Sequence, residues 1–137
     1  MNRDDLRGLA EVRIREARAL FRTRHYDGAY YLTGYAVECA LKACIAKRTK
    51  RYDFPEKRIV VDSHTHDISQ LVKVSGLQAA LEAEMRRDPA FEVNWAIVKD
   101  WNEGARYSRH DVQAATSIID AVTDRRHGVF QWLRHHW

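Results

Sequence analysis

The 137-residue sequence has few of the residues that break helices or build β-structure, with two prolines and six glycines in all. Alternating β-branched residues occur only in the short run Ile59-Val60-Val61. We therefore expect helices joined by loops, with one loop around Pro55. The sequence also lacks a glycine-rich phosphate loop and a Gly-x-Ser-x-Gly elbow, so it gives no support to P-loop or α/β-hydrolase chemistry.

Long hydrophobic runs are absent too. No apolar stretch approaches the ~20 residues of a membrane span, and the charged start Met1-Asn2-Arg3-Asp4-Asp5 has no signal-peptide core behind it, so we expect a cytoplasmic protein. The only cysteines, Cys39 and Cys44, lie five residues apart on a predicted helix. That spacing is too long for a disulfide, which predicts two buried free thiols.

The composition and length are those of an ordinary globular domain. Hydrophobic residues make up 45% and charged residues 31%, which argues against disorder, and the length predicts one domain over residues 1–137. The formal net charge is +4, with 14 Lys or Arg against 8 Asp or Glu in residues 1–58 and 4 against 8 in residues 59–104. A basic first half and an acidic middle are compatible with nucleic-acid binding or with attraction between two copies.

Apolar periodicity predicts an all-α, up-and-down four-helix bundle with one or two short extra helices. Gly76 is expected to end the first short helix and Pro89 to follow the second. Asp27 is a predicted N-cap, and Ser108-Arg109-His110-Asp111 has the spacing of a capping box. The expected helices cover residues 4–24, 27–47, 67–74, 77–87, 91–103 and 108–133.

The second predicted helix is small or apolar around most of its circumference, which favours a place at the centre of the bundle or at a dimer interface. One strip differs: Tyr31, Tyr35, Glu38 and Lys42 lie within ~60° of one another at 100° per residue. We call these four residues the tyrosine strip. Glu38 and Lys42 form at least a helix-stabilising i,i+4 pair.

Arg13 projects from the middle of the apolar face of the first predicted helix. A buried guanidinium needs a partner, because an unpaired buried charge costs several kcal/mol. We expect a structural buried pair between Arg13 and Glu38.

Seven histidines raise the question of a metal site. Di-iron bundles need Glu-x-x-His on two helices, and the only acidic analogue is Asp124-Arg125-Arg126-His127. His64-Thr65-His66 has no indicated third ligand, and His135-His136 lies at the end of the chain. We expect neither a metal nor another cofactor.

Three segments together resemble the HEPN domain family. They are Tyr26 to Ala43 with the pattern Ala-x-Glu-x-x-Leu-Lys, then His66-Asp67-Ile68-Ser69-Gln70-Leu71, then Arg106-Tyr107-Ser108. The resemblance implies a dimerising helical bundle, often encoded beside a minimal nucleotidyltransferase in two-gene toxin-antitoxin pairs. Some members bind nucleotides and others are toxin ribonucleases.

Ribonuclease members of that family use an Arg and a His with four to six residues between them. Here Arg106 and His110 have three residues between them and Arg109 and His110 have none. A metal-free ribonuclease needs a base and a cation, which Arg106 or Arg109 with His110 could supply. The non-catalytic alternative is that both arginines form ion pairs with nearby carboxylates and that His110 is exposed to solvent.

We therefore predict a nucleotide- or RNA-phosphate-binding module without efficient catalysis of its own. The binding residues would be Arg106, Tyr107 and Arg109, faced by Tyr31, Tyr35 and Lys42 of the tyrosine strip. Two alternatives stay open: a metal-independent ribonuclease that uses Arg106, Arg109 and His110, and a pure protein-interaction module.

Overall fold

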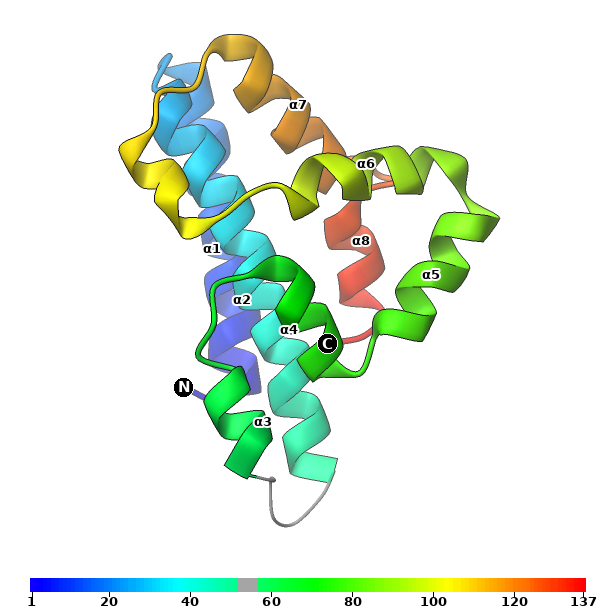
Figure 1. Cartoon of the computed structure of the whole chain (residues 1–137). Helices are drawn as coiled ribbons and strands as arrows, with labels where there is room; N and C mark the ends of the chain where they lie inside the picture. The colour runs from blue at the N-terminus through cyan, green and yellow to red at the C-terminus, as the bar shows by residue number, and fades with distance from the viewer. Residues whose placement is uncertain (52–56) are drawn as a thin grey trace.

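Two long antiparallel helices form the spine of the computed structural model, which describes residues 1–51 and 57–137. α1 covers Arg3–Arg22 and α2 covers Tyr26–Arg51, and they pack along most of their length (Figure 1). The capping box of Asn2 and Asp5 fixes the start of α1. The tight turn between the two helices places Arg24 at a φ of 63°.

Shorter helices complete the bundle around α2. They are α3 (Lys57–Asp62), α4 (Ile68–Ser75), α5 (Gln78–Arg87), α6 (Pro89–Lys99), the 3₁₀ helix η1 (Glu103–Tyr107), α7 (Val112–Thr123) and α8 (Val129–Arg134). The described residues contain no strand. The all-α bundle expected from the sequence is confirmed.

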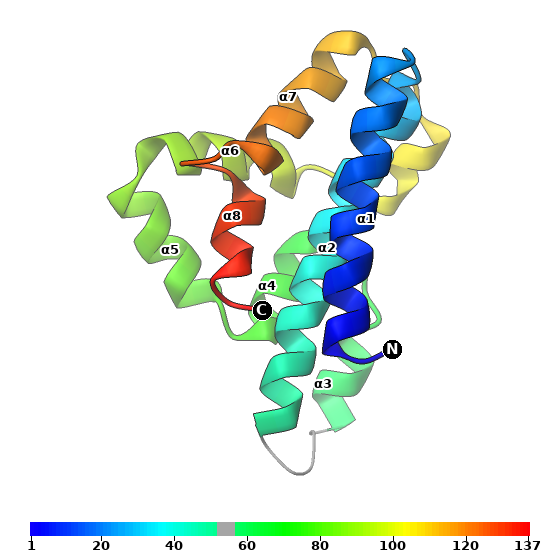
Figure 2. The ribbon, with the colours of Figure 1, turned by 180° about the vertical axis from the view of Figure 1, so that it is seen from behind.

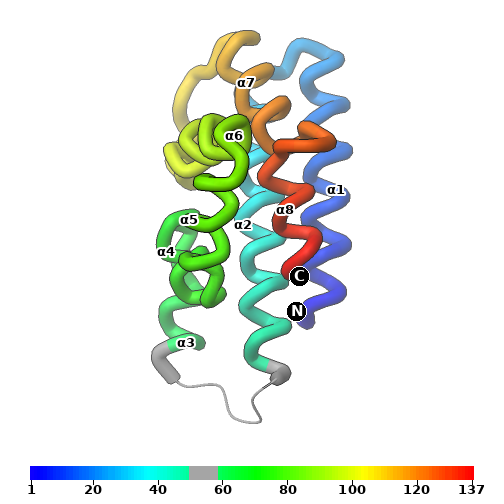
Figure 3. The backbone as a smooth tube through the Cα atoms, turned by 90° about the vertical axis from the view of Figure 1, so that its right-hand side faces the viewer, coloured from blue at the N-terminus to red at the C-terminus, as the bar shows by residue number. Residues whose placement is uncertain are grey.

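α2 lies at the centre of this arrangement. Seen from the side, it stands between α1 and a layer made by α3 to α6, with α7 and α8 packed along a third side (Figures 2 and 3). Its buried residues include Ala36, Val37, Ala40, Leu41 and Ala43, each fully enclosed. The wide apolar circumference of α2 is therefore explained by contacts on several sides within one chain.

Polar caps set the ends of the short helices. Asp67 accepts a hydrogen bond from the backbone of Gln70 at the start of α4, and Gly76 ends that helix in the left-handed region at φ 77°. Asp88 caps α6, with Pro89 in the first turn. These boundaries agree with the sequence predictions. The predicted loop around Pro55 lies outside the described residues.

The predicted last helix, residues 108–133, is wrong in two respects. It begins at Val112, because Asp111 rather than Ser108 is the N-cap and accepts a hydrogen bond from the backbone of Ala114. It also ends at Thr123, and a turn through residues 124–128 leads into α8. A Cβ at Gly128 would lie 2.3 Å from the backbone oxygen of Asp124, so this close turn requires glycine.

The chain before α7 differs from the prediction as well. α6 ends at Lys99 instead of residue 103, and the five residues of η1 follow. η1 packs against α2, and it carries Arg106 and Tyr107, whose side chains are exposed.

Candidate functional site

The tyrosine strip on α2 is partly covered by an aromatic ring from the segment between α6 and η1. Tyr31 and Tyr35 stack with ring centroids 6.1 Å apart and an interplanar angle of 11°, and the ring of Trp101 lies 5.8 Å from that of Tyr31. This approach depends on Gly34, where an added Cβ would lie 2.2 Å from the Trp101 ring. A glycine in the middle of α2 thus allows the segment before η1 to dock.

Glu38 lies one turn further along the strip and is almost completely buried. Its Oε1 is 2.9 Å from Nζ of Lys42 and 2.7 Å from Nδ1 of His66, while the other imidazole nitrogen of His66 is 3.3 Å from Oε2 of Glu103. His66 precedes α4 and Glu103 begins η1. A chain of polar contacts therefore joins α2 to the start of η1.

One oxygen of this carboxylate is left over. Oε2 of Glu38 is buried and has no hydrogen-bond partner among the described residues. A buried carboxylate oxygen without a donor is costly, so the contacts to Lys42 and His66 carry the stabilisation of the charge. The predicted i,i+4 pair of Glu38 and Lys42 is present.

The predicted pair of Arg13 and Glu38 is wrong. Nη1 of Arg13 lies 2.5 Å from Oε2 of Glu16, one turn along α1, and the Arg13 side chain is 27% exposed. Glu38 contacts Lys42 and His66 instead, so each of the two residues finds its charge partner elsewhere.

Arg106, Tyr107, Arg109 and His110, which we call the Arg106 corner, follow directly after the Glu103 contact. The guanidinium of Arg106 lies over the ring of Tyr107, 4.8 Å from its centroid, and the Tyr107 residue is 81% exposed. The neighbouring Tyr107 raises the pKa of Arg106, with smaller contributions from Tyr31 and Glu103. Arg106 is thus the residue of this corner that lies near Tyr31 of the tyrosine strip.

Arg109 and His110 sit on the other edge of the corner, against the start of α2. The backbone N–H of His110 donates to Oδ1 of Asp27, and Nη1 of Arg109 is 4.0 Å from Oδ2 of the same residue. Asp27 lies inside the first turn of α2, so it is not the predicted N-cap. Its carboxylate instead anchors the segment that leads into α7.

The imidazole of His110 is stacked flat on Tyr30, with centroids 3.8 Å apart and an interplanar angle of 12°. Its Nε2 atom is buried without a hydrogen-bond partner among the described residues. Burial raises the pKa of the Tyr30 hydroxyl, and Asp100 adds to the effect. The side chain of His110 therefore contributes mainly through aromatic packing on Tyr30.

Two surface cavities flank these residues. One, of about 610 Å³, lies at the turn between α1 and α2 and is lined by Arg24, His25, Asp27, Arg109 and His110. The other, of about 470 Å³, is lined by His66, Trp101 and Glu103 among others. Arg106 lines neither cavity. The structure thus brings the predicted residues together in two adjacent groups, with Arg106 and Arg109 on different edges.

Sequence reasoning missed four residues that build this site. Tyr30 stacks on the ring of His110, and Asp27 accepts a hydrogen bond from the His110 backbone. Trp101 packs against Tyr31. The carboxylate of Glu103 contacts His66. His66 belonged to the motif that carried the family resemblance, but its partner was not evident. The contacts span from 28 to 83 residues along the chain, and no local periodicity reports them.

Cys39 and Cys44 are buried free thiols, as predicted. Burial raises the pKa of Cys39 to about 11 and that of Cys44 to about 12. Within the described ranges, no three His, Cys, Asp or Glu side chains gather closely enough to hold a metal ion. No helix in the same ranges is both long and apolar enough to cross a membrane.

Comparison with known proteins identifies one family. The family model of the HEPN domain matches residues 4–127, which include α1 from its second residue, α2, the Arg106 corner and all of α7. No curated protein and no solved structure matches the chain significantly. The family match covers most of the chain, and we conclude that the protein belongs to the HEPN domain family.

Proposed function

We propose that this HEPN protein binds the phosphate groups of RNA or of a nucleotide at the Arg106 corner. The observation that carries the proposal is the pairing of Arg106 with an aromatic ring instead of a carboxylate. Its guanidinium lies 4.8 Å from the Tyr107 ring centroid, and both side chains are exposed. A cation beside an exposed ring can contact a phosphate and stack on the adjoining base.

Arg109 extends this positive surface. Its side chain is 98% exposed, and its 4.0 Å approach to Asp27 is too long for a strong ion pair. A flexible, solvated guanidinium adds to the sequence-independent attraction for a phosphate backbone. The two arginines stand on either side of Tyr107 and Ser108 in the chain, so one bound strand can meet both.

The tyrosine strip has a supporting role in this proposal. Tyr31 packs against Trp101, Tyr35 stacks on Tyr31, and Lys42 is held by Glu38. These residues keep η1 in place against α2. We assign direct contact with the ligand to Arg106, Tyr107 and Arg109, and positioning to Tyr31, Tyr35 and Lys42.

We further propose that the protein lacks efficient catalysis. A general base must reach the 2′-hydroxyl of RNA, whereas Nε2 of His110 is buried behind the Tyr30 stack. His110 and Arg109 line one cavity while Arg106 is outside it. A ribonuclease that uses Arg106 with His110 would need this ring to turn outward.

Incubating the purified protein with total RNA or tRNA tests the catalytic alternative. We expect no cleavage above background by the parent or by His110→Ala. Cleavage by the parent that His110→Ala abolishes would establish the ribonuclease function and overturn our assignment. His135→Ala is a matched control, since His135 is an exposed histidine at the far end of the chain.

The binding proposal is tested by fluorescence anisotropy with a labelled single-stranded RNA. Arg106→Ala and Tyr107→Ala should each weaken binding by roughly tenfold, in the range of a charge-assisted contact or a base stack. Arg86→Ala removes an exposed arginine of α5, a helix that lies on the opposite side of the molecule from η1, and should have little effect (Figures 1 and 2). Equal losses in Arg106→Ala and Arg86→Ala would reduce the effect of Arg106 to net charge.

Family membership also suggests partners. We propose that the protein forms a homodimer and acts with a minimal nucleotidyltransferase encoded nearby, as in a two-gene toxin-antitoxin pair. Co-expression with a neighbouring nucleotidyltransferase followed by size-exclusion chromatography tests this. A pure interaction module would form that complex and bind neither RNA nor nucleotide in calorimetry.

A further inference from the structure

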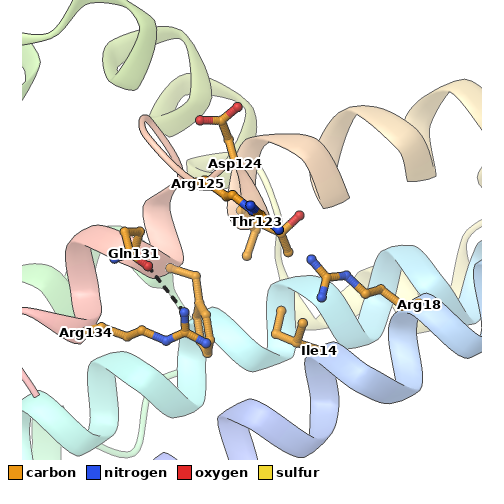
Figure 4. A pocket seen from close by; sticks show the side chains of 9 residues that line it. Ile14, Arg18, Thr123, Asp124, Arg125, Gln131 and Arg134 are labelled. Carbon is orange, nitrogen blue, oxygen red and sulfur yellow. Dashed lines mark hydrogen bonds between the residues drawn. The ribbon is translucent and has the colours of Figure 1, made fainter.

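A cavity away from the Arg106 corner collects arginines from three separate elements. It has a volume of about 420 Å³ and lies where α1 meets the C-terminal end of α7, the following turn and α8 (Figure 4). Arg18 enters it from α1, Arg125 from the turn and Arg134 from α8. Its volume is within the range of small-molecule sites in proteins.

Only one of the three arginines in this cavity forms an ion pair with a carboxylate of the described residues. Arg134 forms a bidentate ion pair with Glu11, in which Nη2 of Arg134 is 2.9 Å from Oε2 of Glu11. This pair largely neutralises the charge of Arg134. Arg18 and Arg125 are exposed and have no carboxylate partner among the described residues. In Figure 4 the guanidinium of Arg18 points across the cavity toward Thr123 and Arg125. Two unpaired cations therefore face one hollow, an arrangement that an anion would stabilise.

The single carboxylate that lines the cavity does not neutralise it. Oδ1 of Asp124 accepts hydrogen bonds from the backbone N–H groups of Arg126 and His127, at 2.9 and 2.7 Å. The side chain of Asp124 points away from Arg18 and Arg134 in Figure 4. Its role is to hold the turn, and through the turn it fixes the position of Arg125.

The floor of the cavity is apolar. Ile14, Val122 and Phe130 line it, and all three are buried. The Phe130 ring is already covered by the Arg134 guanidinium, 4.7 Å from its centroid, and by Trp137. Because that ring has no free face for a base, the recognition elements are the arginines at the rim, which suit a phosphate group.

We propose that this cavity is a second anion site, which binds a small molecule through a phosphate or pyrophosphate group held by Arg18 and Arg125. Guanidinium groups bind phosphate oxygens in a bidentate manner, and arginines on different elements can approach one phosphate group from two sides. The site is separate from the Arg106 corner and does not depend on RNA binding there.

Calorimetric titration of the full chain with pyrophosphate and with inorganic phosphate, at low ionic strength, tests the proposal. Arg18→Ala and Arg125→Ala should each weaken pyrophosphate binding by roughly tenfold, as for loss of a charge-assisted hydrogen bond. Matched controls are Arg126→Ala, next in the turn, and Arg15→Ala, one turn away on α1; both remove exposed arginines outside the cavity. The controls should change the affinity by less than about twofold.

The same variants, assayed against labelled RNA, separate this inference from the proposed function. We expect Arg18→Ala and Arg125→Ala to bind RNA like the parent, because neither arginine belongs to the Arg106 corner. Absence of pyrophosphate binding by the parent, or equal losses in the control variants, would overturn the site. Loss of RNA binding in Arg18→Ala and Arg125→Ala would make the cavity part of the RNA surface and would also overturn it.

Discussion

Nδ1 of His66 lies 2.7 Å from Oε1 of Glu38, and this contact ties the central helix to the segment before α4. Glu38 is 1% exposed, so its charge depends on the few groups that reach it. Because His66 also contacts Glu103, the first residue of η1, the position of the Arg106 corner rests on a carboxylate buried in α2.

Glu38→Gln should destabilise the protein. The neutral amide removes the counter-charge of Lys42 and weakens the contact with His66, and we expect a loss of about 1.5–3 kcal/mol in the free energy of unfolding. Urea denaturation followed by circular dichroism measures it. Glu82→Gln, on the exposed face of α5, is the control, and an equal change in both variants would contradict the role assigned to Glu38.

Gly34→Ala and Gly8→Ala should change stability in opposite directions. An added methyl at position 34 would lie 2.2 Å from the Trp101 ring, and overpacking of this kind costs about 1–3 kcal/mol. At Gly8 no atom lies within 4 Å, so alanine should stabilise α1 by about 0.5–1 kcal/mol. Thermal unfolding of both variants checks the pair. A stabilised Gly34→Ala protein would mean that Trp101 does not dock as described.

Asp88 should contribute stability that disappears in acid. The hydrogen bond with His127 lowers the pKa of the Asp88 carboxyl below its ordinary value of 3.8, against an opposing effect of burial, and backbone N–H donors at the start of α6 add to the lowering. A lowered folded pKa means that the stabilisation is complete above the unfolded value and is lost as pH falls through the folded one.

Urea midpoints measured between about pH 2 and pH 6 follow this loss. The parent should lose more stability below about pH 4 than Asp88→Asn does, since the variant has no such carboxylate to protonate. Asp120→Asn, an exposed position on α7, should follow the parent. Identical acid profiles for the parent and Asp88→Asn would show that the contact of Asp88 with His127 does not stabilise the fold.

The two thiols should be inert in the native protein. With pKa values of about 11 and 12, Cys39 and Cys44 carry almost no thiolate at neutral pH, and both are buried. Reaction with Ellman's reagent should therefore be far slower in buffer than in denaturant. Equal rates would mean that α2 opens readily, contrary to its place in the core.

Local sequence signals predicted the fold class and the boundaries of α1, α4 and α5, whereas contacts distant in sequence decided the site. The apolar pattern continued in register from Val122 to Val129, which hid the break between α7 and α8. Asp124 and Gly128 make that break through backbone hydrogen bonds and close packing. Periodicity reports which face of a helix is buried and does not report such turns.

The buried pair of Arg13 and Glu38 failed for a related reason. Arg13 was expected to need a partner, but the carboxylate that it contacts is on its own helix, and His66 contacts Glu38 from 28 residues away. The Arg106 corner was placed on the same side of α2 as the tyrosine strip, because the family resemblance supplied its position. The stacking of His110 on Tyr30, which separates it from Arg106, could not be predicted from residue spacing.

The salt dependence of RNA binding tests the central claim most directly. If Arg106 contacts a phosphate, the slope of log Kd against log salt concentration should fall by about 0.7 in Arg106→Ala, and the slope for Arg86→Ala should match the parent. An Arg106→Ala protein with the affinity and the salt slope of the parent would contradict the assignment of the Arg106 corner as the phosphate-binding surface.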